Sequence, residues 1–151
     1  MSVYNLKFSA QINNWTDATS EKITEVFHES SVTVVDRMQK IGPSSSYPTG
    51  QGGNMPVDTG WLRASIRASL LIMPTIDKES FPPEGAGPKS IPYNSDTIDN
   101  VIYSANLGET IYIGYTAAYA PNQEEIRAFT RLAAMMWTSI VNGAVSRAKG
   151  K

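Results

Sequence analysis

The chain has 151 residues, of which 41% are hydrophobic and 18% are charged, values typical of a folded globular protein. Its formal net charge of -1 excludes a global basic field that would hold nucleic acid tightly, and the lack of cysteine excludes thiol catalysis, disulfides and cysteine-based metal sites. At this length we expect one domain over residues 1–151.

The first residues, MSVYNLKFSAQINNW, contain no basic stretch followed by an apolar one. No run of the chain approaches the ~18 apolar residues that span a bilayer. We therefore expect a protein that is made in the cytoplasm and has no membrane partner.

An amphipathic helix is predicted from Trp15 to Ile41. Asn14 is in position to cap its first turn, and small Ser30 fills a gap in its apolar stripe. The stripe consists of apolar residues that recur at helical spacing, namely Ile23, Val26, Phe27, Val34, Met38 and Ile41.

Two irregular segments follow, separated by a short strand. Residues 42–56 are rich in Ser, Gly and Pro and predict a mobile loop. Thr59–Ser65 predicts a helical turn, and Ile66–Ile72 predicts a strand. The Pro- and Gly-rich arm at 74–95 is longer than a plain connection, so we expect contacts there and in the loop to become ordered on assembly.

The second half of the chain predicts a hairpin and a long helix. Asn100–Ser104 and Thr110–Tyr115 are β-prone runs joined by a turn, which predicts two antiparallel strands. The apolar residues then repeat every three or four positions, at Ile126, Phe129, Ala133, Met136, Trp137, Ile140 and Ala144. We predict an α+β fold, in which a small antiparallel sheet packs with a long N-terminal and a long C-terminal helix.

The segment PVDTGWLRASI, from Pro56 to Ile66, forms a junction between loop and sheet. Asp58 is expected to cap the turn that begins at Thr59, after Pro56 has restricted the entry of the chain. The residues that are expected to build this structural junction are Pro56, Asp58, Thr59, Gly60 and Leu62. Gly60 is expected to allow an unusual dihedral or a close backbone approach.

Three separated blocks resemble one family. They read GGNMPVDTGWLRASIRASL (52–70), TIYIGYTAAYA (110–120) and RAFTRLAAMMWTSIV (127–141). In this order they resemble the neck, minor tail or tail-completion proteins of tailed bacteriophages. The chain departs from that family after Tyr119 and Ala120, where PNQEEI replaces a Val-Glu-aromatic-Gly stretch.

The resemblance implies a structural protein of the virion neck, with a tail-terminator-like fold. Such proteins form a ring, commonly a hexamer, that joins the tail to the DNA-filled head. The implied partners are other copies of the chain, the head-completion or adaptor protein, and the tail terminator or tail tube. DNA would pass through the lumen without sequence-specific binding. A tail-terminator ring, which caps the tail tube, is the alternative.

We expect part of the junction and of the arm to contact neighbouring subunits. Arg63 and Arg67, four residues apart, are expected to lie together and to meet a carboxylate of a neighbour, because charged rims fix register in assemblies. A solvated basic face is the alternative. The residues that are expected to contact partners are Trp61, Arg63, Arg67, Pro82, Pro83 and Tyr119.

Enzymatic alternatives find little support in the sequence. Asp58-Thr59-Gly60 is also the signature of retroviral-type aspartic proteases, but bulky Trp61 follows and helices flank the predicted sheet. His28, the single histidine, is expected on the surface or at the edge of the apolar stripe of the first helix. A general base is not expected there, because no serine nucleophile motif accompanies it.

No cofactor or metal site is predicted. Asp96, Asp99 and Glu109 lack the spacing of a calcium loop and are expected to be solvated. Phosphate-binding loops of the P-loop type are also absent from the sequence. Trp137 is expected in the core.

Overall fold

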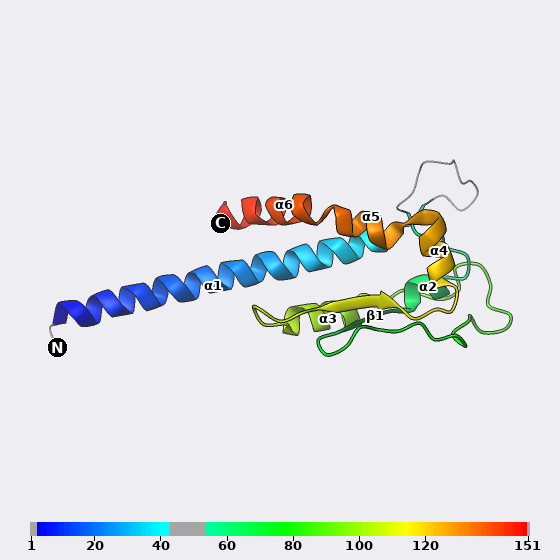
Figure 1. Ribbon diagram of the computed structural model, residues 1–151, viewed down its shortest axis with the longest axis horizontal. Coiled ribbons are helices and arrows are strands. Elements are labelled where there is room, and N and C mark those ends of the chain that lie inside the picture. Colours follow the sequence, from blue (N-terminus) through cyan, green and yellow to red (C-terminus); the bar gives the residue numbers. More distant parts are fainter. Residues whose placement is uncertain (1–2, 43–53, 151) are drawn as a thin grey trace.

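A computed structural model describes residues 3–42 and 54–150 of the chain. The fold is α+β, as predicted, and helices dominate it (Figure 1). In chain order the elements are α1 (Val3–Met38), α2 (Trp61–Ala64), β1 (Ile66–Ser69), α3 (Asp96–Ser104), β2 (Tyr112–Tyr115), α4 (Ala120–Arg127), α5 (Phe129–Met135) and α6 (Trp137–Lys149).

Helix α1 forms the middle of three layers. Helices α5 and α6 pack on one side of it, and α3 with the sheet packs on the other (Figure 1). Small residues allow α6 to approach closely, because Ser30 of α1 and Ala144 of α6 are fully buried. An ion pair between Glu29 and Arg147 borders this contact.

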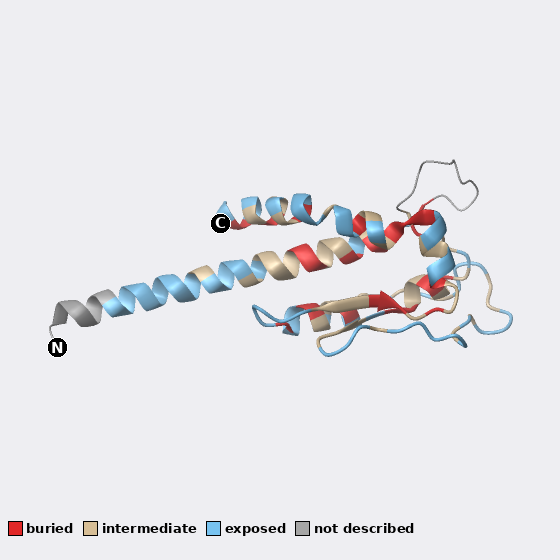
Figure 2. Ribbon diagram, viewed as in Figure 1, coloured by how far each residue is buried: buried red, intermediate tan, exposed pale blue. Residues whose placement is uncertain are grey.

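The helix begins earlier than the sequence predicts. Asn14 lies inside it and is not its cap, because the helix already starts at Val3. The N-terminal half projects beyond the rest of the molecule, and its side chains are exposed from residue 9 to 23 apart from Thr19 (Figure 2). Trp15 is 67% exposed. Nothing in the described chain covers this half of α1.

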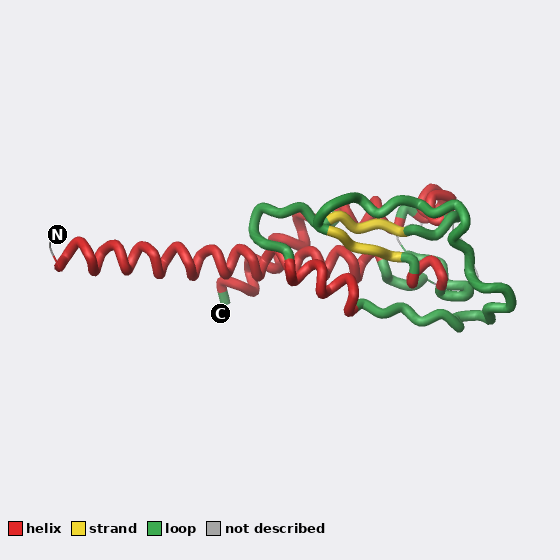
Figure 3. Tube along the Cα trace, turned by 90° about the horizontal axis from the view of Figure 1, so that it is seen from below, coloured by secondary structure: helices red, strands yellow, loops and turns green. Residues whose placement is uncertain are grey.

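The sheet has two strands in the described part of the chain, and they pair antiparallel (Figure 3). Ile66 lies opposite Tyr115, and Ser69 lies opposite Tyr112. The predicted hairpin is wrong in its first strand, because residues 100–104 belong to helix α3. Strand β1 also ends at Ser69, three residues before the predicted Ile72.

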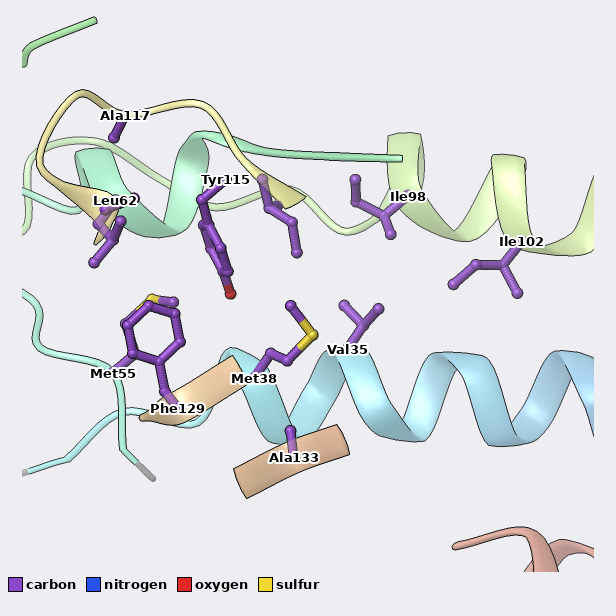
Figure 4. Close-up of a cluster of buried hydrophobic side chains, with 12 residues drawn as sticks. Val35, Met38, Met55, Leu62, Ile98, Ile102, Tyr115, Ala117, Phe129 and Ala133 are labelled. Carbon is purple, nitrogen blue, oxygen red and sulfur yellow. The ribbon is translucent and has the colours of Figure 1, made fainter. Parts of the chain in front are cut away.

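The core lies between α1 and the layer of α3 and the sheet (Figure 4). Tyr115 of β2 meets Phe129 of α5 edge to face, with their ring centroids 5.3 Å apart. The Tyr115 hydroxyl is buried without a hydrogen-bond partner in the described structure, and burial raises its pKa. The remaining core side chains come from six elements and two loops, and they are Val35, Met38, Met55, Leu62, Ile66, Ile98, Ile102, Ala117, Ala120 and Ala133.

The predicted C-terminal helix is divided into three helices. Ala128 has φ 52° and ends α4, and Met136 separates α5 from α6. Glu124 joins the first two helices, because its carboxylate accepts hydrogen bonds from the backbone N–H groups of Thr130 and Arg131 at 2.9 Å each. Trp137 is 42% exposed, so its expected place in the core is wrong.

The two predicted irregular segments have different outcomes. Most of the 42–56 loop lies outside the described residues, but its ends meet where Met55 donates a 2.7 Å hydrogen bond to the carbonyl of Lys40. The 74–95 arm is described and irregular up to Ser95, the residue before α3. Its backbone is hydrogen-bonded to the segment after β2, where the N–H of Ala118 donates to the carbonyl of Ser80. The arm is therefore held against the rest of the subunit by backbone hydrogen bonds.

Within the described ranges, no helix is both long enough and apolar enough to cross a membrane.

Candidate functional site

The junction segment turns tightly against the arm. Gly60 has φ 96°, and a Cβ built on it would lie 2.2 Å from the carbonyl oxygen of Ile91. The backbone N–H of Ile91 in turn donates a hydrogen bond to the carbonyl of Thr59 at 2.9 Å. The backbone N–H of Lys89 donates to the backbone carbonyl of Asp58 at 2.6 Å. Glycine is thus required at position 60 for both reasons predicted from the sequence, its dihedral and the close approach of another backbone segment.

Asp58 does not have its predicted role. Its side chain is exposed, and Gly60, not Asp58, precedes α2 as the N-cap residue, without a side-chain cap. The hydroxyl of Thr59 accepts a 3.3 Å hydrogen bond from the N–H of Trp61. The helix begins only at Trp61, three residues after Asp58, and the left-handed Gly60 occupies the N-cap position in between.

A groove of about 550 Å³ opens beside the junction. The junction loop forms one wall, the arm forms a second with Phe81 and Pro82, and the region of α4 closes it with Tyr119, Gln123 and Arg127. The groove therefore gathers residues that the sequence proposed separately. These are Pro56, Asp58, Thr59, Gly60, Leu62, Pro82 and Tyr119.

Helix α4 contributes two polar residues to the groove, Gln123 and Arg127. Arg127 is only 8% exposed. The side-chain oxygen of Gln123 is buried and has no hydrogen-bond partner among the described residues. A buried acceptor without a partner costs free energy.

Tyr119 forms the middle of the groove. Its ring lies 6.4 Å from that of Phe81, centroid to centroid. Burial raises the pKa of the Tyr119 hydroxyl, the backbone of Leu62 lowers it through a hydrogen bond, and the charge of Asp58 raises it. The hydroxyl is consequently protonated at neutral pH and able to donate or accept a hydrogen bond.

Arg63 and Arg67 do not form the predicted pair on one helix face. Helix α2 ends at Ala64, so that Arg63 lies in the helix and Arg67 lies in β1. The guanidinium of Arg63 covers the ring of Tyr93 at 4.9 Å. Arg67 is exposed and donates to the carbonyls of Ala64 and Ile66. Arg63 thus contacts the arm of its own subunit, whereas the side chain of Arg67 remains exposed.

The other predicted contact residues lie outside the groove. Trp61 is half-buried and packs against the core, while its indole N–H has no partner in the described structure. Pro83 is exposed next to Pro82. Neither side chain lines the groove.

His28 lies within α1 and is half-buried, which agrees with the predicted place at the edge of the apolar stripe. Its Nε2 is 2.8 Å from the carbonyl oxygen of Ala105, and its ring meets Tyr103 edge to face. Asp96 and Asp99 lie in the first turn of α3 and not in a loop. In the described part of the chain, no group of His, Asp and Glu side chains is arranged to hold a metal ion.

Sequence reasoning missed the α4 side of the groove. Gln123 and Arg127 are four residues apart and therefore share a face of α4. That spacing was present in the sequence, but the apolar repeat that continues to Ala144 favoured one long helix and hid the short one. Phe81 and Val57 were also missed, because their contribution depends on how the arm folds.

Comparisons with known proteins assign no function to this surface. No protein-family profile, curated protein sequence or solved structure matches the chain.

Proposed function

We propose that this chain is a structural subunit of the neck of a tailed bacteriophage, where it completes the tail and joins it to the head. The observation that carries the proposal is the PVDTGWLRASI segment, together with the two later blocks that resemble the same family. A structural task for this segment is supported by the way in which Gly60 and the arm lock it into a junction between loop, helix and sheet.

Uncovered apolar surface also supports a role within an assembly. Monomeric soluble proteins rarely leave large apolar patches in water, and such patches mark sites of interaction. The projecting half of α1 exposes Ile12, Trp15 and Ile23. A second patch, at Leu71–Met73, follows β1. Both surfaces gain free energy when a partner covers them.

The projecting half of α1 has little reason to be helical by itself. NNWTDATS, from Asn13 to Ser20, is rich in residues with modest helix propensity. Three threonine hydroxyls bond back to carbonyls four residues earlier, at Ile12, Trp15 and Ser20. A helix of this composition gains most of its stability from packing. A neighbouring protein of the neck would supply that packing.

Electron microscopy of lysates from a phage that lacks this gene tests the proposal. Tail completion predicts finished tails of normal length beside unattached, DNA-filled heads. Overlong tails would instead point to tail termination. Normal virions in normal numbers would contradict both roles.

A further inference from the structure

We draw no further inference here: the strongest candidate, the exposed apolar patch of Ile12, Trp15 and Ile23 on the projecting half of α1, carries none, because nothing in the described structure shows what covers it.

Discussion

The carbonyl oxygen of Ile91 lies against Gly60 and leaves no room for a side chain, since a Cβ there would be 2.2 Å away. This contact joins the arm to the junction segment. It also makes Gly60 the residue on which the shape of the groove depends, because the neighbouring junction residues line that groove.

Gly60→Ala should therefore destabilise the subunit strongly. The left-handed dihedral alone costs about 1–2 kcal/mol for a residue with a Cβ, and the clash with backbone adds to it. Gly85→Ala is the control, because Gly85 has φ 78° but no atom within 4 Å of the added Cβ. Thermal unfolding should show a clearly larger loss for Gly60→Ala. Equal losses would mean that the Ile91 contact does not constrain the site.

Asp58→Ala should have little effect on stability. The exposed carboxylate caps no helix, so the loss of about 1 kcal/mol that a cap would give is not expected, and the change should stay within about 0.5 kcal/mol. Urea unfolding measures this directly. A loss near 1 kcal/mol or above would show that the carboxylate supports the turn after all.

Glu124→Ala should be more costly, because its carboxylate holds the first turn of α5. Two N–H groups at a helix start lose a charged acceptor, for which we expect a loss of about 1–2 kcal/mol. Glu125→Ala removes the same charge from the adjacent, exposed position and serves as the control. Denaturant unfolding of both variants should separate them, and similar midpoints would argue against the cap.

Asp36→Asn should stabilise the chain at neutral pH and not in acid. Partial burial, followed by the charge of Asp99, raises the pKa of the Asp36 carboxyl above 3.8. A raised carboxyl pKa favours folding below 3.8 and loses that contribution as the pH rises through the folded value. The advantage of the variant over the wild type should accordingly appear above about pH 4 and be modest, because solvent screens this exposed side chain.

Thermal unfolding in acid and at neutral pH checks this dependence. Asp17→Asn, which removes the same charge from the exposed half of the same helix, is the control for the change of charge. An Asp36→Asn variant that loses stability relative to the wild type as the pH rises would contradict this prediction.

The sequence predicts those parts of the fold that depend on local pattern. Leu62 and Ile66 are buried, the turn and the strand after it form, and the apolar positions Phe129 and Ala133 of the C-terminal region enter the core. These outcomes follow from side chains whose spacing matches the element that they occupy.

The failures have physical causes that lie outside local pattern. Residues 100–104 are β-prone, yet Ile98 and Ile102 are four apart and both buried, so packing against α1 and the sheet decides for helix α3. Ala128 adopts a left-handed conformation that ends α4, and no glycine or proline at this position indicates the end of a helix in the sequence. Strand β2 pairs with β1 across the arm, and a pairing so distant in sequence leaves no local signal.

The candidate site was predictable only in part. The junction residues could be found from the sequence, but Gln123 and Arg127 join them only because α4 is a separate helix. Arg63 could not have been assigned to Tyr93 without the fold of the arm.

Gold labelling of intact virions with antibodies against this chain tests the central claim most directly. The proposal predicts label at the junction between head and tail, and no label there when antibodies against an unrelated protein are used. Label at the distal tail tip, or virions that carry none of the chain, would contradict a place in the neck.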